Sequence, residues 1–260
     1  EARTHVRRDA AWCGPCANSF PLGPGRQAIH GQWKGLRGKG GALCSGAFRY
    51  PLFGNAVYEG ALVSGRRHGA GRQVCHSGVY VGEFKDGEMS GSGRRQYCDG
   101  GSYQGEWRAG LKHGHGRLEF PNGDSYEGEF SEGEMHGHGV YSLSNGDVYT
   151  GGMHRDAMQG EGEYMFGAPL VGRYKGQFVG NKRHGKGSLE FEDKMVTYSY
   201  AGDFRDDAQT GHGVLHMSCG DKYSGEFLDG KYHGCGEYVY RDGSVYKGEF
   251  YHGLMHGLVT

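Results

Sequence analysis

Apolar and polar positions alternate in short runs along most of the chain, and the runs come in pairs. The first run of a pair places an aromatic residue, a glycine and a second aromatic residue at two-residue steps, as in Tyr103, Gly105 and Trp107. The second run begins with two glycines two residues apart, as in Gly114 and Gly116, and continues with apolar residues at the same step. Because strand side chains alternate between two faces, this period predicts β-strands and not helices.

The paired runs repeat at a nearly constant interval. Their opening tyrosines are Tyr58, Tyr80, Tyr103, Tyr126, Tyr149, Tyr174, Tyr200, Tyr223 and Tyr246. The steps between these tyrosines are 22, 23, 23, 23, 25, 26, 23 and 23 residues. Turn pairs such as Asn122 and Gly123 separate the runs and are typical of hairpins. We predict an all-β chain, an elongated single antiparallel β-meander of tandem hairpin repeats of about 23 residues each, about 90 Å long at two strands a repeat.

The glycines indicate which face of the sheet is packed. One face carries the aromatic residues of the first strand and the glycines of the second, so rings can lie on bare backbone. We expect Gly137→Val to be far more damaging than Glu129→Gln, because Val would occupy the place of a ring while Glu129 faces solvent. Glu83, Glu106, Glu129, Glu226 and Glu249 recur on the opposite face.

Several repeats depart from the pattern. Asp156, Asn181 and Asp207 replace the glycine of the first turn, and Leu62 and Met153 replace the second aromatic residue. We expect local distortion in these repeats. The second glycine of the last repeat is replaced by Val259. All the length variation falls in the second turn, before Tyr80, Tyr174 and Tyr200, where loops for partner recognition or neutral insertions fit equally well.

The chain divides into three parts. Residues 1–29 read as an extended arm with four arginines and three prolines, residues 30–57 as a degenerate first repeat, and residues 58–260 as nine repeats, of which the last is incomplete. The arm is either disordered or ordered by a partner.

Composition and charge narrow the class of protein. The chain has 53 glycines in 260 residues and a formal net charge of -1, so no global field favours nucleic acid or anionic lipid. No apolar run approaches the roughly 18 residues of a membrane span. The 7 cysteines are dispersed and odd in number, which favours a reducing compartment.

Two patterns suggest chemistry. Cys13 and Cys16 reproduce the spacing of a thioredoxin motif, but the surrounding sequence has no βαβ pattern, so we expect neither redox catalysis nor a metal site there. His68, His113, His136, His184, His233 and His256 occupy one repeat position. Equivalent histidines two strands apart are about 10 Å apart, too far for one metal ion, so we expect a structural ladder. We expect no catalytic residue, cofactor or metal.

The recurring Tyr-x-Gly-x-(Phe/Trp) and Gly-x-Gly motifs resemble the MORN (membrane occupation and recognition nexus) repeat over residues 58–260. This resemblance implies a non-catalytic scaffold that binds proteins of a cytoskeletal assembly, and known members favour the axoneme of a cilium or flagellum, as in radial spokes. A peripheral phospholipid-binding adaptor and the regulatory region of an enzyme are the alternatives.

We expect protein binding at the array's ends and along its aromatic groove. The open strand of the unfinished last repeat offers an edge for pairing with another chain. The candidate binding residues are Trp33, Phe84, Trp107, Phe130, Phe178, Phe204, Phe227, Tyr246, Phe250, Tyr251 and Leu254.

Overall fold

The computed structural model describes residues 43–51, 56–169, 171–192 and 197–257, and all its regular elements are β-strands. The predicted arm, most of the degenerate first repeat, Trp33, Cys13 and Cys16, and Val259 lie outside these residues. The described chain falls into two compact units. Residues up to 123, together with 129–133, form the first unit, and residues 124–128 with those from 134 onward form the second.

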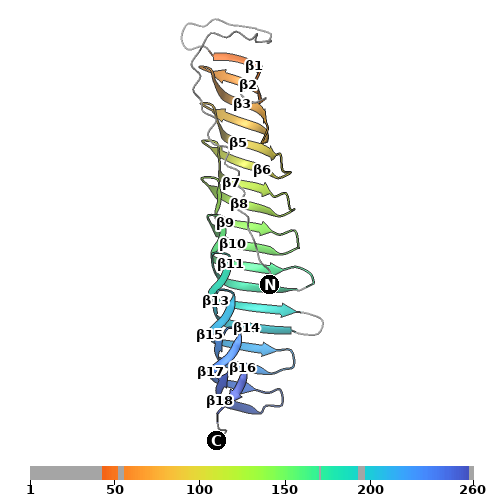
Figure 1. Ribbon diagram of the computed structural model, residues 1–260, viewed down its shortest axis with the longest axis vertical. Helices are drawn as coiled ribbons and strands as arrows, with labels where there is room; N and C mark the ends of the chain where they lie inside the picture. The colour runs from red at the N-terminus through yellow and green to blue at the C-terminus, as the bar shows by residue number, and fades with distance from the viewer. Residues whose placement is uncertain (1–42, 52–55, 170, 193–196, 258–260) are drawn as a thin grey trace. The chain divides into compact units, whose positions relative to one another are not determined.

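The first unit is a run of antiparallel hairpins in which each strand pairs with the next (Figure 1). Its strands are β1 (Leu43–Pro51), β2 (Val57–Val63), β3 (Arg66–Cys75), β4 (Gly78–Lys85), β5 (Glu88–Tyr97), β6 (Ser102–Arg108) and β7 (Leu111–Glu119). Strand β8 (Ser125–Ser131) is divided between the two units.

The second unit continues the same pattern of sequential antiparallel pairing. Its strands are β9 (Glu134–Ser142), β10 (Val148–His154), β11 (Ala157–Phe166), β12 (Gly172–Val179), β13 (Lys182–Glu192), β14 (Thr197–Arg205), β15 (Ala208–Met217), β16 (Lys222–Leu228), β17 (Lys231–Val239), β18 (Val245–Tyr251) and β19 (Leu254–His256). The prediction of an all-β chain of tandem antiparallel hairpins is confirmed.

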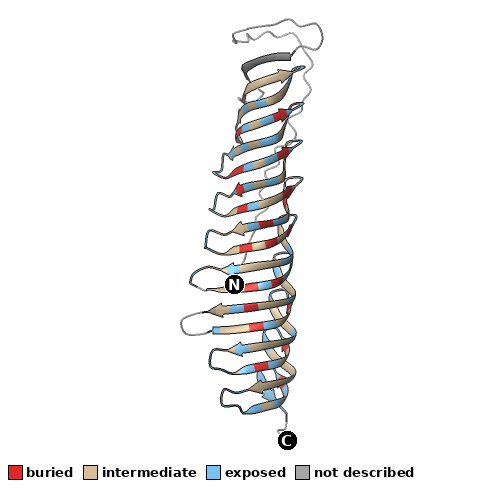
Figure 2. Cartoon of the chain, turned by 180° about the vertical axis from the view of Figure 1, so that it is seen from behind, coloured by how far each residue is buried: buried red, intermediate tan, exposed pale blue. Residues whose placement is uncertain are grey.

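The core is a row of tyrosine rings on glycine backbone. Tyr103 is fully buried at 0% exposure, and a Cβ built on Gly116 of the next strand would lie 2.4 Å from its hydroxyl oxygen. The hydroxyl donates a hydrogen bond to the Glu106 carbonyl oxygen at 3.0 Å. The same arrangement recurs in both units, and the buried positions recur along the strands in Figure 2. The expectation of rings lying on bare backbone is therefore confirmed.

The two glycines of each Gly-x-Gly pair have different structural roles. The first lies at a bulge where the pairing register shifts, as Gly114 does with φ 57°, and Gly137 has a similar left-handed φ of 60°. The second lies beneath the ring, as Gly139 does beneath Tyr126. The reason given above for the damage by Gly137→Val was therefore wrong. The cost at Gly137 comes from a left-handed backbone that a β-branched residue adopts poorly.

The expected distortion at substituted first turns is also wrong. Asp156, Asn181 and Asp207 have φ values of 64°, 69° and 72°, in the same left-handed region as glycines of the other first turns. Each side chain also accepts a hydrogen bond from a backbone N–H of the preceding repeat, as Asp156 does from Met135 at 2.8 Å. Asp and Asn tolerate this conformation, so the turns keep their geometry and gain a contact.

Candidate protein-binding face

We call the side of the sheet that carries the buried tyrosines the ring face, and the other side the open face. On the ring face, each second aromatic residue lies between two tyrosines of successive repeats. The Phe204 ring meets those of Tyr174 and Tyr200 edge-on, with centroids 5.0 and 5.2 Å apart. Edge-to-face contacts of this kind stabilise aromatic clusters. The rings thus form a continuous stack within each unit.

Most of the aromatic residues predicted to bind partners belong to this stack. Exposed fractions of only 2–4% are found for Phe84, Trp107, Phe130, Phe178, Phe204, Phe227 and Phe250. Cationic side chains add to their cover, since the Arg67 guanidinium lies 5.1 Å from the Phe84 ring centre and the Lys112 ammonium lies 5.1 Å from that of Phe130. These rings offer little surface to a partner while the stack is closed.

The remaining predicted residues lie at the last repeat. Tyr246 is half-buried, while Tyr251 and Leu254 are exposed at 56% and 73%. The predicted open edge is partly paired, because β19 aligns with the end of β18 through Tyr251 and Leu254. Trp33 lies outside the described residues.

A second apolar row on the ring face is accessible, and the residue prediction missed it. It follows the second strands of the second unit, on the side of the stack nearer the second turns. Its members are Tyr141, Leu143, Tyr164, Phe166, Leu215, Met217, Tyr238 and Tyr240, with Phe191 and Tyr198 between them. All are half-buried except Tyr240, which is 37% exposed. We call these ten residues the second-strand row.

The second-strand row is most aromatic around β11 to β14. Phe166 and Phe191 have ring centroids 4.9 Å apart, and Phe191 and Tyr198 have centroids 5.2 Å apart. Gly172 lies between Phe166 and Phe191 in the register, and a Cβ there would come within 2.4 Å of the Phe191 ring. The missing side chain therefore lets the two rings approach across an intervening strand.

The sequence did contain a signal for the second-strand row. Apolar residues follow the Gly-x-Gly pair at two-residue steps, and this step places them on the ring face. In the first two repeats, Gln73 and Arg95 occupy the first of the two equivalent positions and Cys75 and Tyr97 the second, while the third repeat carries Leu118 and Phe120. The apolar row is thus interrupted in the first two repeats and is most continuous in the second unit.

Carboxylates of the second turns hold tyrosines of this row in place. Asp147 accepts hydrogen bonds from the Tyr164 hydroxyl and the Gly167 amide, both at 2.7 Å. Burial, and then the bond to Asp147, raises the pKa of Tyr164. Partial burial would raise the pKa of Asp147, but the bonds from Gly167, Tyr164 and Asn145 lower it below its ordinary value. Asp221 makes the same pair of contacts with Tyr238 and Arg241.

One enlarged second turn adjoins the aromatic part of the row. It joins β11 to β12, directly after Phe166 (Figure 1). Val171, in this turn, is 55% exposed. An apolar surface beside an enlarged loop is an arrangement suited to binding an apolar segment of a partner.

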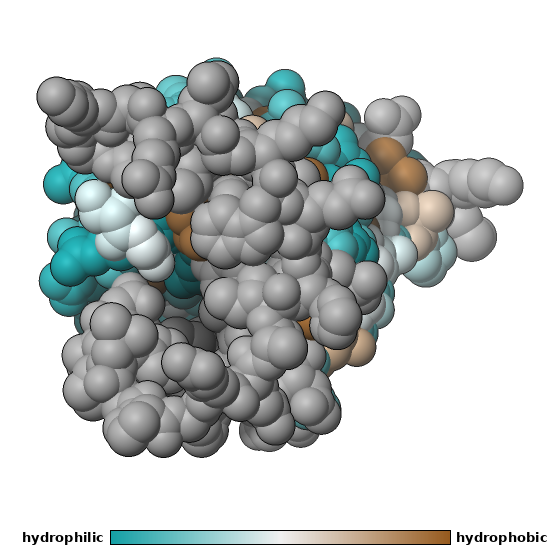
Figure 3. Space-filling view, turned by 90° about the horizontal axis from the view of Figure 1, so that it is seen from above, coloured by the Kyte–Doolittle hydropathy of each residue, from teal (hydrophilic) through white to brown (hydrophobic). Residues whose placement is uncertain are grey.

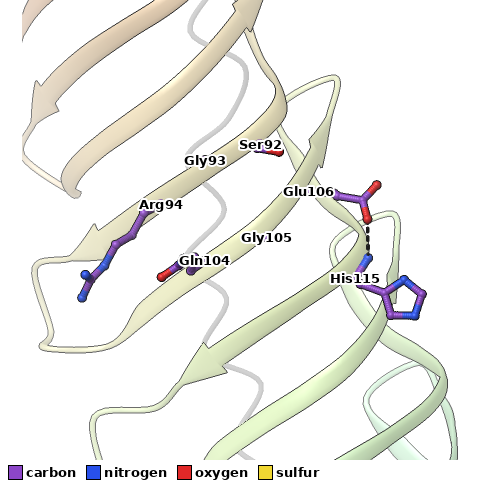
Figure 4. A pocket seen from close by; sticks show the side chains of 7 residues that line it. All are labelled: Ser92, Gly93, Arg94, Gln104, Gly105, Glu106 and His115. Carbon is purple, nitrogen blue, oxygen red and sulfur yellow. Dashed lines mark hydrogen bonds between the residues drawn. The ribbon is translucent and has the colours of Figure 1, made fainter.

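The open face carries the repeated glutamates and is more polar. Figure 4 shows a shallow hollow there, lined by Ser92, Gly93, Arg94, Gln104, Gly105, Glu106 and His115. The Glu106 carboxylate accepts the His115 backbone N–H at 3.0 Å, and Glu226 does the same for Cys235. These glutamates therefore hold the strand bulge in addition to facing solvent. Where described residues are visible end-on in Figure 3, the surface is mainly hydrophilic.

The histidine ladder makes local contacts across strands. His113 lies 3.2 Å from the Arg108 guanidinium, and the His233 ring lies 5.5 Å from that of Tyr251. No group of three potential metal ligands occurs in the described part of the chain. Cys75, Cys98, Cys219 and Cys235 are free thiols. The described residues contain no helix with the length and apolarity that crossing a membrane requires.

Tandem antiparallel hairpins with a ring stack running from repeat to repeat define this chain as a repeat protein. Comparison with family models agrees, since the MORN repeat model matches residues 58–79, 80–102, 103–125, 126–148, 149–167, 174–196, 200–221, 223–245 and 246–258. The chain belongs to the MORN repeat family. Repeats of this family generally mediate interactions with proteins or lipids, which indicates a binding scaffold. A comparison with curated proteins found no match.

Proposed function

We propose that this protein is a non-catalytic scaffold that holds partner proteins in a cytoskeletal assembly, and that this assembly is the axoneme of a cilium or flagellum. The second-strand row supports the first part of the proposal, because it presents half-buried aromatic and aliphatic side chains beside the enlarged turn between β11 and β12. The cytoskeletal and axonemal parts rest on the likeness to known MORN scaffolds.

The placement of the basic residues favours a protein partner over anionic lipid. Adjacent arginines in a strand point to opposite faces, so a pair such as Arg66 and Arg67 cannot act together. Arg67 and Arg183 lie over rings of the stack, and Arg183 also pairs with Asp207 at 3.1 Å. Lipid headgroups are bound by clusters of about four to eight basic residues.

Isolation of the native complex at low and high salt tests the proposal. Apolar contact should survive high salt, whereas attachment to anionic lipid should fade as the Debye length falls to about 3 Å at 1 M. We expect identified axonemal proteins to stay bound. Flotation with anionic liposomes that salt abolishes, together with loss of every protein partner, would favour the lipid alternative.

Matched variants locate the binding surface. Phe191→Ser removes a half-buried ring of the second-strand row, and Val179→Ser removes a 49% exposed apolar side chain from the open face. We expect Phe191→Ser to release the partner and Val179→Ser to retain it, with both variants folded by circular dichroism. Equal retention by the two variants would place binding elsewhere.

A further inference from the structure

One pair of histidines is brought together only by the fold. His136 belongs to β9 and His154 to the end of β10. The register pairs His138 with Gly152 and Gly137 with Met153, so His154 lies across from His136. Their ring centroids are 5.0 Å apart and the rings are tilted by 57°. His154 is exposed and His136 is half-buried, so both rings can be reached from solvent.

This pairing occurs once among the nine repeats. His136 is a member of the repeated ladder, but His154 occupies a position that is not histidine elsewhere. The equivalent residues are Val63, Lys85, Arg108, Ser131, Val179, Arg205, Leu228 and Tyr251. Among the described strands, a ladder residue faces a second histidine at this cross-strand position at β9 and β10. His233 also approaches an imidazole, that of His252 in the first turn of the last repeat, with ring centroids 5.5 Å apart, but His252 does not occupy the position of His154. Repetition of the sequence pattern does not account for the pair of His136 and His154.

The separation of the rings fits a single bridging metal ion. A histidine nitrogen lies about 2.1 Å from zinc, so its ring centre is about 3 Å from the metal, and two rings on one tetrahedral ion have centres about 5 Å apart. Imidazole is a ligand suited to zinc, nickel and copper ions. We propose that His136 and His154 form a cross-strand site for a divalent zinc, nickel or copper ion, with water in the remaining coordination positions.

Binding at this site would connect the second strand of one repeat to the first strand of the next. The first turn that follows His154 contains Asp156, whose carboxylate accepts the Met135 N–H at 2.8 Å. A metal ion would thus add to a contact already made between the same two strands. Because it binds only the folded pairing, it should stabilise the fold in proportion to its concentration.

The experiment titrates the full chain with Ni²⁺ in the presence of a reductant and follows the imidazole resonances by NMR and the melting temperature. We expect selective broadening of His136 and His154 and a raised melting temperature. His154→Ala should weaken this binding by about ten-fold or more, since one of two ligands is lost. His184→Ala is the matched control, because residue 205 across from His184 is an arginine.

A gain of binding tests the geometry independently of any damage to the native pair. In the His154→Ala background, Arg205→His places an imidazole across from His184, and we expect it to restore Ni²⁺ binding there. Wild type and His154→Ala with equal affinity and the same broadening would overturn the proposal. Absence of binding by the Arg205→His variant, with its fold intact, would overturn the cross-strand geometry.

Discussion

Glycines of the same repeat respond to different constraints. Gly110 lies in a first turn with φ 79°, and a Cβ there would have no neighbour within 4 Å. Gly116 lies under the Tyr103 ring, where a Cβ would be 2.4 Å from the hydroxyl oxygen. The first position requires a backbone conformation and the second requires an absence of volume. The same substitution, made separately at each position, should therefore distinguish the two constraints.

Asparagine makes this comparison because it tolerates a left-handed backbone. We expect Gly110→Asn to change the free energy of unfolding by no more than about 0.5 kcal/mol, since Asn181 fills the equivalent turn position. Gly116→Asn should cost about 2 kcal/mol or more, because the Tyr103 ring has to move. Chemical denaturation measures both. Similar losses for the two variants would contradict the assignment of their roles.

At the scale of the strand and turn, carboxylates connect successive hairpins. Asp147 lies in the turn before β10 and binds Tyr164 and Gly167 at the end of the next hairpin. Asp242 occupies a similar turn but bonds only Ser244 within it, through the amide and the hydroxyl. One aspartate thus ties two hairpins, while the other shapes its own turn.

Asp147→Ala should cost about 1–3 kcal/mol, because it leaves the hydroxyl of the half-buried Tyr164 and the Gly167 amide without their acceptor. Hydrogen exchange at the Gly167 amide should accelerate in this variant. Asp242→Ala is the control and should leave that amide unchanged. Since the pKa of Asp147 is lowered in the folded state, its contribution should also be lost as the pH falls below the ordinary carboxylate range.

The sequence predicted the strands of each repeat correctly but not the contacts and geometry of the turns. Alternation and the 23-residue step predicted the hairpins and their faces, because both follow from local backbone geometry. The ties made by Asp147 and the undistorted turn at Asp156 were not predicted. They depend on partners about 20 residues away, and the strand register that brings those partners near is set by bulges.

At the scale of the whole molecule, each repeat mainly contacts its neighbours, so damage should stay local. Phe227→Ala removes a ring that meets Tyr200, Tyr223 and Tyr232. We expect hydrogen exchange to accelerate in β14 to β17, while the amides of β10 to β12 keep their wild-type protection. Uniform acceleration across the second unit would show that it unfolds as one cooperative block.

The buried tyrosines also predict sensitivity to alkali. Burial raises the pKa of Tyr80, Tyr174 and Tyr223 to about 12. A raised folded-state pKa gives stability that is complete below the unfolded value of about 10 and is lost as the pH rises toward 12. Thermal unfolding between pH 9 and about 12 should show a steadily falling midpoint. A midpoint independent of pH in this window would contradict the burial of these hydroxyls.

The sequence alone determined the repeating hairpin, its length and the face on which Tyr103 and Gly116 meet. The alternation of side chains along a strand and the regular spacing of the glycines fix these features locally. Only the tertiary structure decided which apolar residues remain accessible. Phe204 is buried because tyrosines of two repeats enclose it edge-on, whereas Phe191, near the end of β13, stays half-buried although the rings of Phe166 and Tyr198 lie beside it. The meeting of His136 and His154 has the same origin, since cross-strand register is a property of the paired strands and not of either sequence run.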